Sequence, residues 1–154
     1  MSSSETSPTP PSLSTFVLDE NFPQPILAEA VLRKAVRKRV QLEIKMLSDV
    51  DAALLGYQDH DLIRALDARG AEGLITCDDA MVFRPEVQKV IQDTGFSVVT
   101  CRKAGDDPIR ATGLVLVHLR EIGQEHSKGH DQIWRLGAAK AKPLSVAQHR
   151  RQNS

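Results

Sequence analysis

Aspartates at three places in the 154-residue chain have the residue type and the setting to bind a cation. They are Asp19, the pair Asp59 and Asp61, and the neighbours Asp78 and Asp79. Carboxylates that are brought together repel each other, and protonation or a hard cation relieves that repulsion. A set of oxygen ligands without His or Cys suits Mg²⁺ or Mn²⁺ rather than Zn²⁺. Such ions generate a nucleophilic water and neutralise charge on a phosphodiester, so the pattern indicates metal-assisted phosphodiester hydrolysis.

Two of these places lie where a buried strand is expected to end. Residues 16–18 form an apolar run that stops at Asp19, and residues 74–77 form a second run that stops at Asp78. In open α/β sheets, ligands and catalytic groups collect at the carboxyl ends of strands. If the first strand is central and the second lies beside it, their ends are about 4.8 Å apart. We therefore expect the carboxylates of Asp19 and Asp78 to face one small volume.

A purely structural role is the alternative for several of these aspartates. Asp59 or Asp61 could be the N-cap of the helix that follows, and Asp79 could cap the short segment after it. Asp19 fits a cap less well, because a cap does not require the acid-acid-amide sequence that follows the apolar strand. His60 lies between two acids and is expected to be a surface helix residue rather than a ligand. The sequence shows no glycine-rich phosphate loop, Ser-His-Asp constellation or Cys-His metal spacing, which disfavours those enzyme classes.

Strand and helix patterns alternate through the body of the chain. Strands are expected at residues 16–18, 40–46, 74–77, 96–101 and, as a short terminal element, around 133–136. Helices are expected at about residues 25–39, 62–70, 85–95 and from 108 onward, with an acid-rich loop at 48–51. The run at 40–46 alternates apolar and polar residues, which is typical of an edge or near-edge strand. The alternation predicts an α/β fold with a mostly parallel sheet, right-handed crossovers and helices on both faces.

The folded unit is expected to span residues 15–141. Residues 1–14 are dominated by Ser, Thr and Pro, have little to bury and are expected to be disordered. From Lys142 onward the chain is polar, and a loose C-terminal tail is expected over residues 142–154.

The composition narrows the class of protein without indicating its partners. Hydrophobic residues make up 41% of the chain and aromatic residues only 4%, so the core must be aliphatic, which favours an α/β protein. Twenty basic residues balance twenty acidic ones, and any basic surface must therefore be local. Cys77 and Cys101 lie inside apolar runs and are expected to act as small buried hydrophobes in a reducing compartment. No signal-peptide core or long apolar run is present, which predicts a cytoplasmic protein with no membrane partner.

Local groups of basic residues are the candidates for phosphate contacts. One group closes the first expected helix: Arg33, Lys34, Arg37, Lys38 and Arg39. This group is either a solvated helix end that complements the helix dipole or a phosphate-contacting surface. Arg84, Arg102 and Lys103 lie nearer to the acidic strand ends, and Arg84 follows Asp78 by only six residues.

Three motifs, taken in order, resemble a known family. Residues 16–23 read Phe-Val-Leu-Asp-Glu-Asn-Phe-Pro, residues 56–63 read Gly-Tyr-Gln-Asp-His-Asp-Leu-Ile, and residues 74–79 read Leu-Ile-Thr-Cys-Asp-Asp. This series resembles the bacterial PIN-like proteins that open with a Leu-Asp-Glu-Asn-x-Pro motif and are allied to the VapC-type toxins. The match runs from about residue 15 to about residue 105, and the long helix after it also has a counterpart in the family.

The resemblance implies a three-layer α/β/α fold and an acidic cluster that binds Mg²⁺ or Mn²⁺ to cleave RNA. Asp19 would be the first acid, Asp59 the second with Asp61 as a close rival, and Asp78 the third. Arg84, Arg102, Lys103, Arg37 and Lys38 would then contact the RNA. Many relatives carry a further aspartate where this chain has Ala80, and Asp79 is the candidate substitute. The expected partners are RNA and a protein antitoxin, with a homodimer as a further alternative.

Two other functions stay open at this point. A PIN-like domain that has lost catalysis would serve as a binding or regulatory module. A receiver-like phosphoacceptor also has paired acids at one strand end, an aspartate at another and a lysine at a later strand end, where Lys103 could serve. Against the receiver, Asp59 is expected at the start of a helix rather than after an apolar strand.

Overall fold

The structure is a computed structural model that describes residues 13–36, 41–127, 129–137 and 142–153. Its strands are β1 (Ser14–Leu18), β2 (Leu42–Met46), β3 (Gly73–Thr76), β4 (Ser97–Cys101) and β5 (Gln132–Leu136). Its helices are α1 (Pro25–Val36), α2 (Leu47–Asp51), α3 (Asp59–Ala68), α4 (Pro85–Thr94), α5 (Pro108–Glu125) and α6 (Val146–Gln152). Two 3₁₀ turns, η2 (Ala52–Leu54) and η3 (Asp79–Phe83), precede α3 and α4.

The five strands form one parallel sheet in the order β2-β1-β3-β4-β5. Strand β1 therefore lies between β2 and β3, and Leu18 pairs in register with Met46 on one side and Ile75 on the other. This order confirms the expectation that the first strand has the Asp78 strand as its neighbour. It also confirms that residues 42–46 form an edge strand. Because all strands run the same way, all their carboxyl ends lie at one edge of the sheet.

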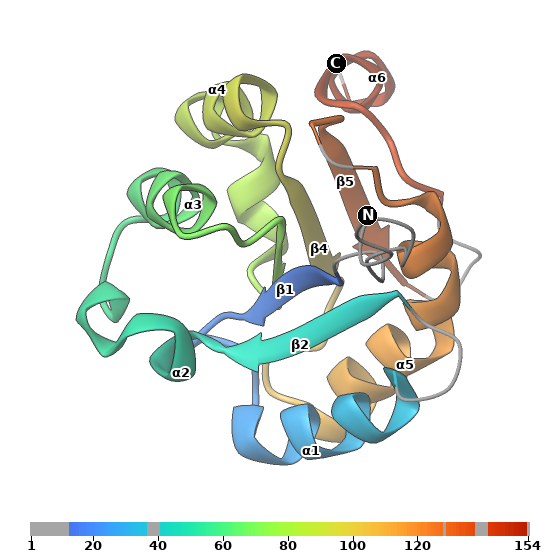
Figure 1. Cartoon of the computed structure of the whole chain (residues 1–154). Coiled ribbons are helices and arrows are strands. Elements are labelled where there is room, and N and C mark those ends of the chain that lie inside the picture. The colour runs from blue at the N-terminus through green and yellow to red at the C-terminus, as the bar shows by residue number, and fades with distance from the viewer. Residues whose placement is uncertain (1–12, 37–40, 128, 138–141, 154) are drawn as a thin grey trace, which may run out of the picture.

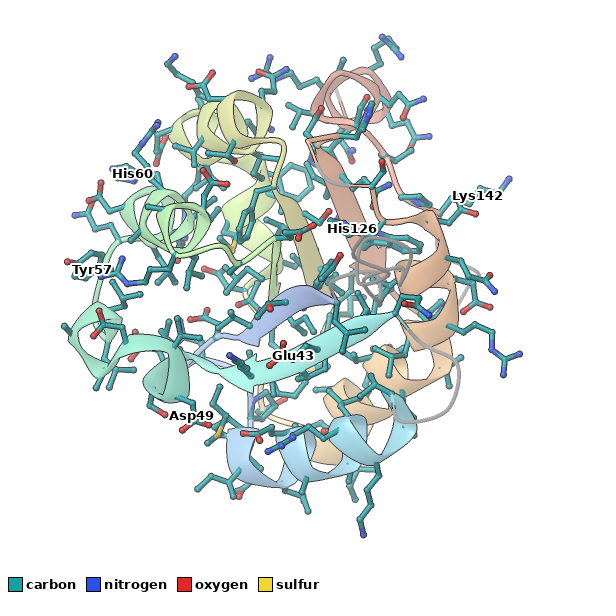
Figure 2. The ribbon with its side chains drawn as sticks, viewed as in Figure 1. Glu43, Asp49, Tyr57, His60, His126 and Lys142 are labelled. Atoms are coloured by element: carbon teal, nitrogen blue, oxygen red, sulfur yellow. The ribbon has the colours of Figure 1, made fainter. Side chains whose placement is uncertain are left out.

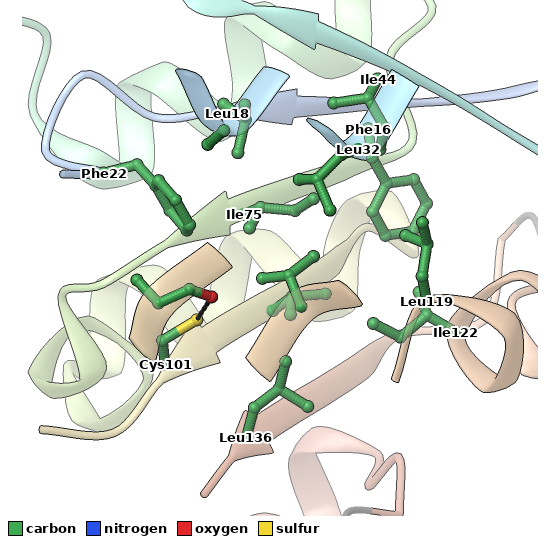
Figure 3. Close-up of a cluster of buried hydrophobic side chains, with 14 of the residues drawn as sticks. Phe16, Leu18, Phe22, Leu32, Ile44, Ile75, Cys101, Leu119, Ile122 and Leu136 are labelled. Carbon is green, nitrogen blue, oxygen red and sulfur yellow. Dashed lines mark hydrogen bonds between the residues drawn. The ribbon is translucent and has the colours of Figure 1, made fainter. Parts of the chain in front are cut away.

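Helices cover both faces of this sheet, which confirms the predicted α/β class. Helices α1 and α5 pack together on one face, and α3, α4 and α6 lie on the other (Figure 1). Successive residues of a strand point to opposite faces, so Phe16 and Leu18 enter one core while Val17 enters the other. Figure 3 shows the first core, in which Phe16, Leu18 and Ile75 meet residues of α1 and α5. Burial on both faces is the reason that the central strands read as continuous apolar runs.

The helix boundaries follow from prolines, caps and one glycine. Pro25, Pro85 and Pro108 each stand at the first helical position, where the missing N–H costs nothing. The Asp107 side chain caps α5 by accepting a hydrogen bond from the backbone of Arg110. Helix α4 ends at Gly95, whose φ of 68° lies in the left-handed region that favours glycine.

Two segments differ from the sequence-based expectation. The expected acid-rich loop around residues 48–51 is the helix α2, which continues directly from β2 and buries Leu47. The expected loose tail contains α6, whose first turn is closed by a capping box between Ser145 and Gln148. Val146 and His149 are three residues apart, so they lie on one face of α6, and both are fully buried. The tail appears polar in sequence because so few residues carry this packing.

The ends of other predicted segments shift slightly. Ser14, expected in the disordered tail, begins β1 and donates a side-chain hydrogen bond to Glu72. Residues 1–12 of that expected tail lie outside the described residues, as do Arg37, Lys38 and Arg39. Cys101 is buried as expected and contacts the Ala111 carbonyl in Figure 3, whereas Cys77 is only half-buried, and both are free thiols. Within the described ranges, no helix combines the length and the apolar character needed to cross a membrane.

Glycine at position 73 is required by packing, which gives a first prediction. A Cβ atom at Gly73 would lie 2.4 Å from the ring of Phe16, its register partner across β1 and β3. We expect Gly73→Ala to destabilise the fold by about 1–3 kcal/mol, the usual cost of overpacking a core. Gly113 in α5 is the matched control, because nothing lies within 4 Å of its Cβ position. Gly113→Ala should stabilise by about 0.5–1 kcal/mol. Urea unfolding of both variants measures this, and equal effects of the two changes would contradict it.

Candidate active site

Asp19 directly follows β1 and has a buried carboxylate. Its backbone N–H continues the β1–β3 ladder by donating to the Ile75 carbonyl, and the residue is only 2% exposed. The Thr76 hydroxyl donates a hydrogen bond to Asp19 Oδ2 at 2.9 Å. Burial raises the pKa of Asp19 above its ordinary value, and the negative charge of Asp59 adds to the rise, although the bond from Thr76 opposes it. The surroundings of Asp19 therefore disfavour the charged form of its carboxyl group.

Thr76 connects Asp19 to Asp78. The same Thr76 hydroxyl oxygen accepts a hydrogen bond of 3.1 Å from the backbone N–H of Asp78. One side chain at the end of β3 thus holds the first acid and the backbone of the third. Sequence reasoning missed this residue, and the available signal was a hydroxyl residue two positions before the acid at the end of an apolar strand.

Asp59 brings a second charge to the same place from α3. It is the first residue of α3, and the N-cap is Gln58, which makes no side-chain capping bond. Burial and the charge of Asp78 raise the pKa of Asp59, while Arg84 opposes the rise. Because Asp59 raises the pKa of Asp19 and Asp78 raises that of Asp59, the three carboxylates form one electrostatic group, here called the acidic trio. The role of Asp59 as a helix cap is not what the structure shows.

Arg84 is the cation that balances the acidic trio. Its guanidinium contacts two members, with Nη1 bonded to Asp59 Oδ2 and Nη2 lying 3.5 Å from Asp78 Oδ2. The side chain of Arg84 remains partly exposed, so water screens part of this attraction. Arg84 was expected to bind RNA, and the structure places it on the acids instead. A contact with RNA stays a prediction that would require this side chain to be shared or displaced.

Asp79 lies beside the trio in sequence but serves another partner. Arg135 on β5 donates to both of its oxygens at 3.0 and 2.7 Å, and the Thr100 hydroxyl donates to Oδ1 at 2.7 Å. Burial alone would raise the pKa of Asp79, but the hydrogen bonds from Arg135 and Thr100 outweigh it and lower the pKa. Arg135 also covers the ring of Phe83, 4.7 Å from its centroid. Asp79 thus joins η3 to β4 and β5, and it neither caps a helix nor faces the trio as a free ligand.

Asp61 is directed away from this group. Its side chain is 60% exposed, and its Oδ1 lies 3.6 Å from His60 Nε2. Figure 2 shows His60 on the outer side of α3. Of the two rivals for the second acid, the structure brings Asp59 to the trio and leaves Asp61 in solvent.

The donor set fits a hard cation in chemistry but not yet in arrangement. Carboxylate oxygens with raised pKa values are the groups that Mg²⁺ or Mn²⁺ would stabilise in their charged form. Across the part of the chain that the structure describes, however, no three His, Cys, Asp or Glu side chains are grouped closely enough to hold a metal ion. Arg84 occupies the position between Asp59 and Asp78 where an ion would bring these carboxylates together.

The other basic residues expected at the site follow β4. Arg102 and Lys103 are both exposed, and neither forms an ion pair with any residue in the described ranges. Arg102 lies close enough to Asp79 for its charge to help lower the pKa of that carboxyl group. Lys103 has a φ of 54°, a left-handed backbone that turns the chain from β4 toward α5.

A serine–histidine–glutamate network links three elements of the fold. Ser97 Oγ lies 3.0 Å from His126 Nδ1, and His126 Nε2 lies 2.8 Å from the carboxylate of Glu72. The order of contacts is that of a hydrolytic triad, although the sequence showed no such motif. The Ser97 side chain is fully buried, and the ring of Phe16 packs edge-on against His126 at 5.0 Å. The network therefore ties the end of α5 to the starts of β3 and β4, at the amino edge of the sheet.

Comparisons with known proteins give no identification. No model of a protein family matches the chain, and neither does any curated protein or solved structure. Membership of the PIN-like family therefore remains a proposal that rests on the three sequence motifs.

The pKa of Asp19 is raised and that of Asp79 is lowered, so replacing each of them should have opposite effects on stability in the absence of divalent cations. The raised pKa of Asp19 means that its contribution is favourable at acid pH and is lost as the pH rises through the folded-state pKa. The lowered pKa of Asp79 means that its contribution is present at neutral pH and is lost as the pH falls through the folded-state pKa. At about pH 7 we therefore expect Asp19→Asn to raise Tm and Asp79→Asn to lower it.

Thermal melting in EDTA between about pH 3 and pH 8 measures both effects. Each difference from the wild type should shrink toward acid pH, where the carboxyl groups of all three proteins are protonated. A lower Tm of Asp19→Asn at neutral pH would show that the Asp19 carboxylate is neutralised in the fold and is not under stress.

Proposed function

We propose that this protein is a metal-dependent ribonuclease of the PIN-like kind and the toxin of a toxin–antitoxin pair. One observation carries the proposal: Asp19, Asp59 and Asp78 come from three separate elements, and the charge of Asp59 raises the pKa of Asp19 while the charge of Asp78 raises the pKa of Asp59. These are the three positions that the sequence motifs select. A fold does not gather repelling carboxylates for stability, so a ligand that stabilises their charge is the simplest reason for the arrangement.

Mg²⁺ or Mn²⁺ would be held by Asp19, Asp59 and Asp78, and it would supply a nucleophilic water and charge stabilisation for a phosphodiester. The chain contributes the orientation of the acids. Thr76 holds Asp19 and the backbone of Asp78 at the end of β3, and α3 carries Asp59 toward them. Asp79 is already engaged by Arg135, so it does not replace the aspartate that relatives have at the position of Ala80.

Arg84 sets the condition for metal binding. Its guanidinium already neutralises part of the charge of Asp59 and Asp78, and a divalent cation would compete for the same oxygens. If these acids held an ion, the guanidinium of Arg84 would be free to bind an RNA phosphate. The proposed partners are accordingly RNA and a protein antitoxin, with a homodimer as an alternative assembly, in the cytoplasm.

A receiver-like phosphoacceptor is the second candidate, and the strand order favours it. The order β2-β1-β3-β4-β5 is that of flavodoxin-like doubly wound proteins. Two contacts speak for the nuclease instead. Glu20, the second acid after β1, accepts a hydrogen bond from the backbone N–H of Gly56 and is therefore already engaged. The cation beside Asp78 is Arg84 rather than Lys103. Phosphorylation of Asp78 by acetyl phosphate, lost in Asp78→Asn, would establish the receiver function.

The central test combines metal binding with RNA cleavage. We expect Mn²⁺ to raise the Tm of the wild type and to support cleavage of a labelled single-stranded RNA. Asp19→Asn should lose both effects, because it removes one charge from the trio without losing the acceptor of the Thr76 hydrogen bond. Asp61→Asn is the matched control, since it removes the same charge from an exposed carboxylate outside the trio.

Each failure of this test has a distinct meaning. Equal stabilisation of the wild type and Asp19→Asn by Mn²⁺ would show that the trio is not the metal site. If Mn²⁺ binds through Asp19 but no RNA is cut, the protein is a PIN-like binding module that lacks the acid replaced by Ala80.

Arg84 gives a separate prediction. Arg84→Gln should bind Mn²⁺ more tightly than the wild type, because the competing cation is gone, and it should bind RNA more weakly. Isothermal titration with Mn²⁺ and RNA binding in EDTA measure the two effects independently. Weaker Mn²⁺ binding in Arg84→Gln would mean that Arg84 organises the acids for the metal and does not compete with it.

A further inference from the structure

A charged pocket is lined by Arg135, the partner of Asp79. It is a hollow of about 350 Å³ between β5 and α6, within the size range of small-ligand sites. Its apolar floor is Ile133 and Leu144, which are joined by antiparallel backbone hydrogen bonds. Its walls include Arg102, Arg135 and Lys142. The β5–α6 pocket, as we name it, thus exists because the C-terminal segment folds back along the open edge of β5.

The charge of the β5–α6 pocket is positive. None of its lining residues in the described ranges is acidic, and Arg135 forms an ion pair with Asp79. Arg102 and Lys142 have exposed side chains and form no ion pair with any residue that the structure describes. Two cations outside any ion pair of the described residues therefore line one hollow, although the whole chain has a net charge of zero. Cations gathered without acids are the usual basis of phosphate recognition.

A buried polar atom marks the same pocket. His149 of α6 lines it and is fully buried, and its Nε2 has no hydrogen-bond partner among the described residues. Burial and the charge of Arg135 lower the pKa of His149 below its ordinary value. Buried nitrogen atoms in folded proteins are almost always paired, and those that are not require an explanation.

We propose that the β5–α6 pocket binds a phosphate group, held mainly by Arg102 and Lys142. Its place suggests the source of that phosphate. Arg135 lines the pocket and donates a hydrogen bond to Asp79, which follows the trio member Asp78 in the sequence. Strands β3 and β5 are two strand spacings apart, about 10 Å. A single RNA strand crossing the carboxyl edge of the sheet can therefore place one phosphate at the trio and another in the pocket.

The source of the phosphate rests on the proposed ribonuclease function, whereas the pocket itself does not. The chemistry shared by an RNA strand and a free phosphorylated molecule is the phosphate group, and the experiment separates the two. The pocket is tested in EDTA, so that no cleavage and no metal are involved. A failure of metal-dependent cleavage would then leave this result untouched, and the reverse also holds.

The probes are a fluorescein-labelled single-stranded RNA of about ten nucleotides, within the usual range of single-strand site sizes, and adenosine 5′-monophosphate. Binding is measured for the wild type, Arg102→Gln and Lys142→Gln at several salt concentrations. Arg120→Gln is the matched control, because Arg120 is an exposed arginine on α5, which covers the opposite face of the sheet. Lys142 lies on the other side of the molecule from His60 of α3 (Figure 2), so its contribution to RNA binding is separate from any contribution of the α3 surface.

We expect RNA to bind the wild type with an affinity that falls with salt. Arg102→Gln and Lys142→Gln should each weaken RNA binding several-fold and reduce the slope of log K against log salt by about 0.7. Arg102→Lys should restore most of the affinity, and Arg120→Gln should leave it unchanged.

Two results overturn the proposal in whole or in part. If the mononucleotide binds as tightly as RNA and loses affinity in the same variants, the phosphate comes from a free molecule and the RNA source is wrong. If neither probe binds, or if Arg102→Gln and Arg120→Gln have equal effects, the pocket is not a phosphate site.

Discussion

Repulsion among carboxylates at one edge of a parallel sheet is the constraint around which this molecule is arranged. The carboxyl ends of parallel strands all lie at the same edge of the sheet, so the acids that follow the neighbouring strands β1 and β3 lie close together. The fold answers with two arginines of different kinds. Arg135 donates hydrogen bonds to both oxygens of Asp79 and so neutralises its charge. Arg84 contacts Asp59 and Asp78 from a partly exposed position. Asp19 has neither arginine and keeps a raised pKa.

This division separates a structural half of the acidic edge from a reactive half. Residues of β4 and β5 make short, partly buried hydrogen bonds to Asp79, and Arg135 binds it in the two-pronged geometry that fixes side-chain orientation. Residues at β1, α3 and β3 make weaker contacts with a cation that water can reach. Under the proposed function, a metal ion would replace Arg84 as the partner of Asp59 and Asp78 in the reactive half, and a phosphodiester would bind there. The β5–α6 pocket then extends the same edge outward, past the structural half, as a place for a more distant phosphate.

The sequence predicted the α/β class and the positions of Asp19 and Asp78 at neighbouring strand ends, because both depend on local signals. Apolar runs ended by acids located β1 and β3, and proline and glycine located the helix boundaries. What it could not predict depends on contacts between distant positions. The Asp79–Arg135 pair spans 56 residues and the Ser97–His126 pair 29, and no local pattern indicates either. Helix α6 was missed for the same reason, because its stability comes from docking a short apolar face rather than from its composition.

The pairing of Asp79 with Arg135 also has a consequence for the order in which the chain is assembled. A ribosome releases β1, β3 and all of the acids well before it releases β5, since Arg135 follows Asp79 by 56 positions. Until β5 docks, the nascent sheet carries one more uncompensated negative charge and an open hydrogen-bonding edge at β4. Contacts of such long sequence separation form late. The acidic edge therefore acquires the Asp79–Arg135 ion pair only after β5 has been synthesised, 56 positions after Asp79.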